Sequence, residues 1–339
     1  MSQTKSTLCR VYLAIAAGGT LAAMQACTQD QSITPAQSTS QGEPVAPNEP
    51  YRLVENWAQL PDGLVWGQAI AVETDADGNL VVFHRCSSDT CVGQSEPPLL
   101  KFNPSGELLM SWGEGMLVWP HGLDIDAQGN IWVTDGRHEG EMGEVVHKFS
   151  PEGELLMTIG TPGVAGDGPY TFNGACDVVV AANGDIFVAD GHINNRVVKY
   201  SADGRFLMAW GQAGTGPGEF NMPHSIDIDS QGRVFVADRG NNRVQIFDQE
   251  GRYLDEWTQF GRPSGVFISA DDRLFVADSQ SVDGVNPEFE MGIYYGSAVD
   301  GSIEGYIGDI LTESVTEDAN GVLFSGLVAN RGLVRYEPQ

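Results

Sequence analysis

Basic residues are scarce in this sequence, and their scarcity excludes one class of partner. The 339 residues include 18 lysines and arginines against 46 aspartates and glutamates, which gives a formal net charge of −28. Nucleic-acid binding depends on Lys and Arg side chains that neutralise phosphates. We therefore expect no nucleic-acid partner. The acidic excess indicates a solvated surface and leaves open a site that attracts cations.

A long apolar run, such as a membrane-spanning helix needs, is missing as well. The apolar run from Val11 to Ala23 follows Lys5 and Arg10 and is too short to span a bilayer comfortably, as in the apolar region of a signal peptide. It leads into MQAC at residues 24–27, which resembles a bacterial lipobox.

Residues 1–27 are therefore expected to be a lipoprotein-type signal peptide. A lipid on Cys27 would anchor the protein to the bacterial cell envelope, first of all the outer membrane, on its periplasmic or surface face, and would be its only membrane contact. The alternative is ordinary secretion to the periplasm or beyond. Residues 28–50 are rich in Gln, Ser, Thr and Pro and predict a flexible tether.

Cysteine is also rare, with five in the chain, two of them in the expected signal peptide and anchor. Cys86 and Cys91 in the segment CSSDTC can close a small disulfide loop in an oxidising compartment, and a metal knuckle is the alternative. Cys176 is left over. It is interpreted as a small buried apolar residue, with a soft metal ligand or a reactive thiol as alternatives.

What the sequence has in abundance is a repeat. Six segments share an apolar–polar alternation around a central turn, a pattern that is typical of a β-hairpin. Their turns lie 40 to 55 residues apart. The segments are AIAVETDADGNLVVFHR (69–85), HGLDIDAQGNIWVTD (121–135), CDVVVAANGDIFVAD (176–190), HSIDIDSQGRVFVAD (224–238), SGVFISADDRLFVAD (264–278) and ESVTEDANGVLFSGL (313–327).

A second pair of candidate strands follows each of the first four hairpins, and four short strands per unit are typical of a propeller blade. Residues 51–339 supply about 48 positions per blade for six blades. The sixth unit is one strand short, and residues 51–57 form a spare strand. The sequence predicts an all-β fold in residues 51–339: a monomeric six-bladed β-propeller with four antiparallel strands per blade, closed by its N-terminal strand.

The innermost strand of each blade lines the channel of a propeller, so equivalent positions form a ring. Alignment on the turns places His121, Cys176, His224, Ser264 and Glu313 on this ring, with Ala69 or Ile70 in the first blade. His121, His224 and Glu313 come from alternate blades, about 120° apart. They predict a two-histidine, one-carboxylate metal site with an open position, of the zinc or iron type. Structural histidines are the alternative.

The sequences of the blades resemble NHL repeats, as in ADRGNNRVQIF. Arg243 in this segment and Arg196 in the matching segment of the preceding blade are interpreted as turn and inter-blade hydrogen-bonding groups. WPHGLDIDAQGNIWVTD, NLVVFHR and GPGEFNMPHSIDI further resemble the catalytic domain of peptidyl-α-hydroxyglycine α-amidating lyase. That resemblance implies a central zinc held by three histidines. Two of these fall on His121 and His224, and the third falls on Glu313.

The resemblance also implies a calcium site with the backbone carbonyls of Val72 and Leu123 and a carboxylate at position 314. This chain has Ser314 there, a departure that weighs against calcium.

Two arginines and a tyrosine act on the substrate in that family, and they map onto Arg85, Arg239 and His192. The resemblance implies cleavage of an N-substituted α-hydroxyglycine, a small molecule or a peptide, into an amide and glyoxylate. His192 is a competent base in place of the tyrosine or marks a changed substrate. The alternative is a non-catalytic NHL propeller that binds a peptide, glycan or protein at the cell envelope. A calcium-centred lactonase fits less well, because such channels have Glu, Asn or Asp where this ring has two histidines.

Overall fold

The computed structural model describes residues 50–329 and 331–339, which form one compact unit. The expected signal peptide, the lipid anchor at Cys27 and the tether lie outside these residues. No helix within the described part of the chain is long and apolar enough to cross a membrane.

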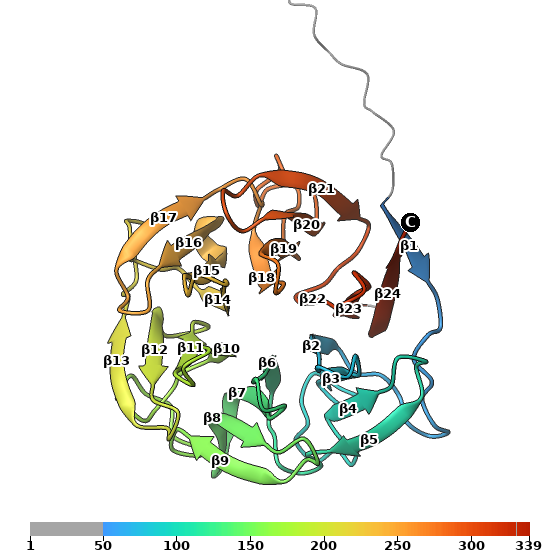
Figure 1. Cartoon of the computed structure of the whole chain (residues 1–339). Helices are drawn as coiled ribbons and strands as arrows, with labels where there is room; N and C mark the ends of the chain where they lie inside the picture. The colour runs from blue at the N-terminus through green and yellow to red at the C-terminus, as the bar shows by residue number, and fades with distance from the viewer. Residues whose placement is uncertain (1–49, 330) are drawn as a thin grey trace, which may run out of the picture. The chain divides into compact units, whose positions relative to one another are not determined.

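The described residues form six four-stranded antiparallel sheets arranged around a central channel, which confirms the predicted six-bladed propeller (Figure 1). Blade one consists of β2 (Ala69–Thr74), β3 (Leu80–His84), β4 (Leu99–Phe102) and β5 (Leu108–Trp112). Blade two consists of β6 (Pro120–Ile125), β7 (Ile131–Glu139), β8 (Met142–Phe149) and β9 (Leu155–Ile159). Blade three consists of β10 (Ala175–Val180), β11 (Ile186–Asp190), β12 (Arg196–Tyr200) and β13 (Phe206–Trp210).

The second half of the ring repeats this plan. Blade four consists of β14 (Pro223–Ile228), β15 (Val234–Asp238), β16 (Arg243–Phe247) and β17 (Tyr253–Trp257), with the short 3₁₀ helix η1 (Arg239–Asn241) between β15 and β16. Blade five consists of β18 (Pro263–Ile268), β19 (Arg273–Asp278), β20 (Gly292–Ser297) and β21 (Ile303–Gly308). Blade six consists of β22 (Val315–Glu317), β23 (Leu323–Leu327), β24 (Gly332–Pro338) and β1 (Tyr51–Val54).

Strand burial follows from position in the blade. The second strand of each of the first four blades lies between neighbouring blades, so β11 and β15 are buried along their whole length. The outermost strand β13 instead alternates half-buried and exposed residues, because only one of its faces packs against the core. The alternation seen in the sequence is therefore clearest in the outer strands.

The hydrophobic core is divided among the seams between blades. The seam of blades one and two, for example, joins Val81 and Phe83 to Val133 and Phe149, all buried. Similar clusters fill the other five seams. Because each blade buries its faces against two neighbours, the ring needs no separate capping element.

The sixth sheet contains both ends of the folded chain. β1 lies outside β24 and pairs with it antiparallel, with Tyr51 opposite Pro338 and Val54 opposite Arg335. The fourth strand of blade six is thus supplied by the first strand of the folded unit (Figure 1).

The arginines of the NNRV segments bind turns, as predicted. Arg243 is buried, pairs with Asp238 at 2.8 Å and donates to the backbone carbonyls of Thr215, Gly216 and Glu219. Arg196 pairs with Asp190 at 2.9 Å in blade three in the same way. These side chains tie the glycine-rich loop that enters each blade to its second strand.

Candidate metal centre

A break in the strand pairing aims the ring residues into the channel. In blades three, four and five the register between the first two strands shifts at Cys176, His224 and Ser264. The same shift occurs at Ile70 and beside His121. A β-bulge redirects the side chain of the extra residue, and these residues line the channel together with Glu313. The predicted ring is confirmed, and Ile70 rather than Ala69 occupies it in blade one.

Close approach of neighbouring inner strands is needed to bring the ring together. A Cβ atom at Gly122 would lie 2.6 Å from the carbonyl oxygen of Cys176 and 2.5 Å from the Cα of Asp177. Glycine is the residue that allows such an approach. The glycine after His121 therefore lets the inner strands of blades two and three lie side by side.

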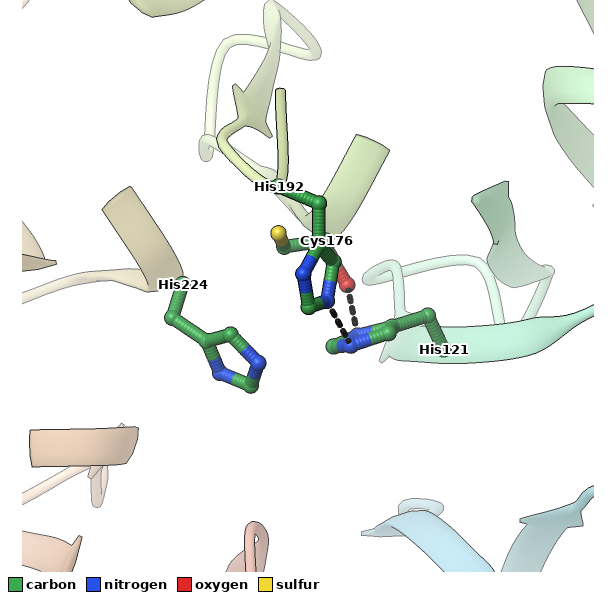
Figure 2. Close-up of side chains that lie close together, drawn as sticks. All are labelled: His121, Cys176, His192 and His224. Carbon is green, nitrogen blue, oxygen red and sulfur yellow. Dashed lines mark hydrogen bonds between the residues drawn. The ribbon is translucent and has the colours of Figure 1, made fainter. Parts of the chain in front are cut away.

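Three imidazoles converge at one end of this channel (Figure 2). His121, His192 and His224, together with Cys176, each offer a ligand atom, and these atoms all lie within 4.8 Å of one another. The Nε2 atoms of His121 and His192 are 2.9 Å apart. The rings of His121 and His224 meet edge to face with their centroids 4.8 Å apart.

Backbone carbonyls of the next blade orient two of the three rings. Nδ1 of His121 lies 2.6 Å from the carbonyl oxygen of Cys176, and Nδ1 of His224 lies 2.7 Å from that of Ser264. A carbonyl can only accept, so both Nδ1 atoms carry the proton and both Nε2 atoms present a lone pair. Nε2 of His224 is buried without a hydrogen-bond partner among the described residues. This is the arrangement that metal-binding histidines show.

Burial keeps the imidazoles neutral. It is the main reason that the pKa values of His121 and His224 lie well below 6.5, and the positive charge of Arg239 lowers both further. Burial and the charges of Arg239, Arg85 and Arg137 lower the pKa of His192 to about 3. Neutral imidazoles are the form that binds transition metals. The donor set therefore fits a divalent metal ion of the zinc type.

Glu313 lies at the edge of this cluster. Its Oε2 is 4.0 Å from Nε2 of His224, whereas its Oε1 accepts a hydrogen bond from Arg239 at 3.3 Å. Ser279 Oγ lies 3.4 Å from the same Oε1. The structure thus brings together His121, Cys176 and His224, which the sequence placed on one ring, and adds His192 to them. That Glu313 is a metal ligand stays a prediction.

Cys176 has the surroundings of a protonated thiol. It is fully buried, and burial raises its pKa far above the ordinary value. Its Sγ donates to the carbonyl oxygen of Gly174 at 3.4 Å. The thiolate is the metal-binding form of cysteine, so the three imidazoles are the better donors.

Both predicted catalytic arginines reach the same end of the channel. Arg239 begins η1 directly after β15 and is buried, and its Nε has no hydrogen-bond partner among the described residues. Arg85 is also buried, donates from Nε to the carbonyl of Pro120 at 3.1 Å and pairs with Asp89 at 3.2 Å. A buried donor without a partner is costly unless a ligand satisfies it.

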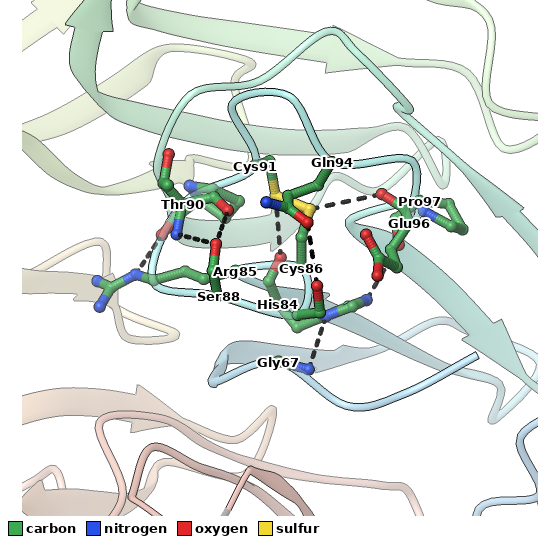
Figure 3. Close-up of a disulfide and its surroundings, with 12 residues drawn as sticks. Gly67, His84, Arg85, Cys86, Ser88, Thr90, Cys91, Gln94, Glu96 and Pro97 are labelled. Carbon is green, nitrogen blue, oxygen red and sulfur yellow. Dashed lines mark hydrogen bonds between the residues drawn. A yellow bond between two sulfur atoms is a disulfide. The ribbon is translucent and has the colours of Figure 1, made fainter. Parts of the chain in front are cut away.

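A disulfide closes the loop that carries Arg85 (Figure 3). Cys86 and Cys91 are bonded, which confirms the loop disulfide and excludes the metal knuckle. The loop contacts blade two, where Cys91 N and Thr90 Oγ1 both donate to the carbonyl of Val118. His84, before Arg85, is a buried structural residue that accepts from Gly67 N and contacts the carbonyl of Pro97.

The strand-terminal aspartate explains the end of the repeated motif. Both carboxylate oxygens of Asp135 accept backbone N–H groups, from Val118 at 2.8 Å and from Trp119 at 2.6 Å. Asp238 accepts from Asn221 in the same manner at 2.7 Å. These bonds hold the segment that enters the inner strand, two or three residues before the ring histidine.

The residues of the predicted calcium site line the same cavity of the channel as the ring residues. Val72 and Leu123 line a cavity of about 180 Å³ together with Ser314. Ser314 Oγ is buried and has no hydrogen-bond partner among the described residues. Calcium prefers several oxygen ligands. Within residues 50–329 and 331–339, however, the histidine cluster is the one group of three or more His, Cys, Asp or Glu side chains close enough to share an ion. Calcium at Val72 and Leu123 stays a prediction from resemblance.

Sequence reasoning assigned His192 to catalysis and missed its place beside the ring histidines. His192 follows Asp190 in the segment after β11, away from the aligned inner-strand position. Trp119 was missed as well. Its ring lies 5.0 Å from that of His121 and 5.1 Å from that of His192, centroid to centroid. The sequence shows a tryptophan directly before Pro120 and His121, but the alignment of the turns did not include the residues that precede the inner strands.

Comparison with known proteins supports the repeat and the fold. The NHL repeat family matches residues 220–247. NHL repeat-containing protein 3 from Homo sapiens is 35% identical over 237 residues, which span 67% of this chain and 66% of that protein. Peptidyl-alpha-hydroxyglycine alpha-amidating lyase 1 from Drosophila melanogaster is 34% identical over 168 residues, or 43% of this chain and 29% of that protein. The chain thus covers less than two thirds of the length of both relatives.

Among solved structures, a streptogramin B lyase superposes with a TM-score of 0.55 at 12% sequence identity, covering 85% of this chain and 98% of that one. At this identity the similarity shows a shared fold and no more.

Proposed function

Because the chain is an NHL-repeat β-propeller that resembles the peptidyl-α-hydroxyglycine α-amidating lyases, we propose that it is a metal-dependent carbon–nitrogen lyase. Its substrate is an N-substituted α-hydroxyglycine, and its products are an amide and glyoxylate. The observation that carries the proposal is the convergence of three neutral imidazoles beside Arg85 and Arg239 at one end of the channel.

The metal ligands in this proposal are His121, His192 and His224. Their ligand nitrogens all lie within 4.8 Å of one another, and two of the rings are oriented by carbonyl hydrogen bonds. A divalent transition metal such as zinc, when bound there, supplies a Lewis acid that makes a substrate hydroxyl more acidic. Three protein ligands leave a position for the substrate.

The sequence prediction makes Glu313 the third ligand and His192 the base, but the geometry favours the exchange of these two roles. His192 Nε2 is 2.9 Å from His121 Nε2 and belongs to the group of ligand atoms that lie within 4.8 Å of one another. Glu313 is held by Arg239 through Oε1, and its Oε2 faces the cluster from 4.0 Å. A carboxylate in that place is suited to accept a proton.

The residues then divide the reaction as follows. Arg239, through its unpartnered Nε, and Arg85 hold the glycine carboxylate of the substrate. Glu313 takes the proton of the α-hydroxyl group as that oxygen becomes the carbonyl oxygen of glyoxylate. The C–N bond breaks, its electron pair stays with nitrogen, and the nitrogen takes up one proton to give the amide. The oxidation state of the α-carbon is unchanged, and the amide and glyoxylate together contain all the atoms of the substrate.

Two substitutions test this assignment. We expect His192→Ala to lower the affinity for zinc roughly tenfold or more, because it removes a ligand. Glu313→Gln should bind zinc as the unmodified protein does and lose glyoxylate release roughly 100-fold or more, because it removes the base and keeps the shape. Zinc content after dialysis and glyoxylate release from an N-acyl-α-hydroxyglycine are the measurements.

The opposite result restores the sequence prediction. Loss of zinc in Glu313→Gln, with zinc retained in His192→Ala, would make the carboxylate the ligand and the imidazole the base. His121→Ala is the common control, because it is a ligand in both arrangements and should lose zinc.

A binding propeller without catalytic activity is the second candidate. The observation in its favour is the 35% identity to NHL repeat-containing protein 3, whose name states no activity. No glyoxylate release by the zinc-loaded protein, from substrates with neutral and with acidic acyl groups, would favour this candidate over the lyase.

A further inference from the structure

Blade two carries a hairpin longer than its counterparts in the ring. β7 and β8 contain nine and eight residues, whereas the equivalent strands of blades three and four contain five each. The pairing of β7 with β8 shifts after Asp135 and resumes with His138 opposite Gly143 and Glu139 opposite Met142. Gly136 and Arg137 fall in this break. A bulge of this kind redirects a side chain from the regular face of the sheet.

The redirected side chain of Arg137 stacks on Trp119. Its Cζ lies 3.8 Å from the centroid of the tryptophan ring, and the Cζ of Arg85 lies 3.9 Å from the same ring. Two guanidinium groups this close to one ring have room only on its opposite faces. Trp119 in turn contacts the rings of His121 and His192. Arg137 is therefore one aromatic ring away from the histidine cluster.

Unlike the other two arginines of the site, Arg137 is available to bind an anion. Arg85 pairs with Asp89, and Arg239 pairs with Glu313. Arg137 is exposed and has no carboxylate partner within the described part of the chain. Glu144, the buried acid of the same hairpin, pairs with His138 and accepts a hydrogen bond from the backbone N–H of Gly174.

This arrangement presents an ordered but unpaired cation at the mouth of the site. Stacking on an aromatic face restricts the arginine without using its N–H donors. A carboxylate bound by Arg85 on one face of the Trp119 ring cannot reach Arg137 on the other face. Arg137 is therefore available to a second anionic group of the same ligand.

We propose that Arg137 is a specificity-determining residue that binds a second carboxylate, carried by the N-acyl part of the substrate. The substrate class is then an N-acyl-α-hydroxyglycine with an acidic acyl group, such as a dicarboxylic monoamide. The substrate part of this inference rests on the proposed lyase function, whereas the binding of a dicarboxylate does not.

Binding of two unreactive analogues tests the inference separately from catalysis. N-Succinylglycine carries the second carboxylate and N-acetylglycine lacks it, and neither has the hydroxyl group needed for cleavage. With the zinc-loaded protein in a calorimeter, we expect tighter binding of N-succinylglycine. Arg137→Gln should weaken that binding roughly tenfold and change the affinity for N-acetylglycine by less than about twofold. Arg137→Lys should fall between, because it keeps the charge and loses the planar fork.

Arg205→Gln is the matched control, since Arg205 is exposed in the turn between β12 and β13 and also lacks a carboxylate partner among the described residues. It should leave both affinities unchanged. The inference is overturned if the unmodified protein does not prefer N-succinylglycine, or if Arg137→Gln weakens both analogues equally. Selective binding without glyoxylate release from the corresponding hydroxyglycines would contradict the lyase and uphold the role of Arg137.

Discussion

The orientation of the ring histidines depends on single atoms of the neighbouring blade. His121 in blade two donates to the carbonyl of Cys176 in blade three, and His224 in blade four donates to the carbonyl of Ser264 in blade five. In both cases the acceptor is the ring residue of the next blade. The same type of hydrogen bond therefore occurs at two positions of the channel. Because it uses Nδ1 of each histidine, it leaves Nε2 of each free to bind a metal.

A group of half-buried carboxylates lines the same channel. Glu73, Asp124, Asp177 and Asp227 line it. Burial raises the pKa of Glu73 to about 8 and those of Asp124 and Asp177 to about 7, and repulsion from neighbouring carboxylates further raises the pKa values of Glu73 and Asp124. Glu73 Oε1 accepts hydrogen bonds from Thr316 Oγ1 at 2.8 Å and from the N–H of Thr74 at 2.9 Å.

The raised pKa of Glu73 predicts a loss of stability with rising pH. The unfolded chain releases this proton near pH 4.5, whereas the folded protein keeps it until about pH 8. Stability is therefore full below the unfolded pKa and is lost as the pH rises through the folded one. Glu73→Gln keeps the neutral shape. Its free energy of unfolding should be higher than that of the unmodified protein by at most about 5 kcal/mol at pH 9, and unchanged at pH 4.

Urea unfolding at both pH values measures this difference. Glu55→Gln, at an exposed position after β1, is the control and should leave the pH profile as it is. The negative charges of Asp124 and Asp177 face Glu73, so their own titration remains in the variant. The interpretation fails if Glu73→Gln and the unmodified protein lose stability in parallel between pH 4 and pH 9.

Among the elements, the loop between β3 and β4 has the most direct influence on the site. It begins with Arg85, is closed by the Cys86–Cys91 disulfide and is held on blade two by hydrogen bonds to the carbonyl of Val118. That carbonyl directly precedes Trp119. The loop therefore couples the position of Arg85 to the segment that leads to His121.

Removal of the disulfide should destabilise the fold and loosen this loop. A double Cys86→Ser, Cys91→Ser variant frees the closed loop in the unfolded chain, and we expect a loss of about 2 kcal/mol in the free energy of unfolding. Thermal unfolding with and without dithiothreitol is the measurement. Dithiothreitol should lower the Tm of the unmodified protein and leave that of the double variant unchanged. An equal shift in both proteins would assign the effect to something other than this bond.

For the whole molecule, the decisive contact is the one that closes the ring. Tyr51 of β1 is buried, meets the ring of Tyr295 edge to face at 5.6 Å and accepts a hydrogen bond from Arg273 at 2.8 Å. Both of these partners belong to blade five. The first residue of β1 therefore joins blade six to blade five, as well as pairing with the last strand of the chain.

Tyr51→Ala should weaken the entire propeller. It removes a buried aromatic side chain and leaves the donor of Arg273 without this partner, so we expect the free energy of unfolding to fall by about 3 kcal/mol. Arg52→Ala, on the exposed side of the same strand, should change it by less than about 1 kcal/mol. Chemical denaturation followed by tryptophan fluorescence measures both. Similar small losses in the two variants would mean that the ring is stable without this contact.

The repeat in the sequence was sufficient to predict the blades and the ring positions. Strands alternate with a period of two, and turns carry recognisable residues, so the hairpins around Gly129 and Gly232 indicate where each inner strand begins. With the inner strand placed, His121 and His224 must face one channel. The disulfide followed from two cysteines five residues apart. All of these are local relations along the chain.

Only the tertiary structure brought His192 to His121 and Arg137 to Trp119. Both side chains leave the regular strands, His192 after the end of β11 and Arg137 in the break between β7 and β8. No periodicity governs the direction of a side chain at such a point. That direction depends on how two neighbouring blades pack and on where a bulge falls, and these are properties of the folded ring. The sequence therefore determined the channel and two of its histidines, and the folded ring decided which other side chains meet them.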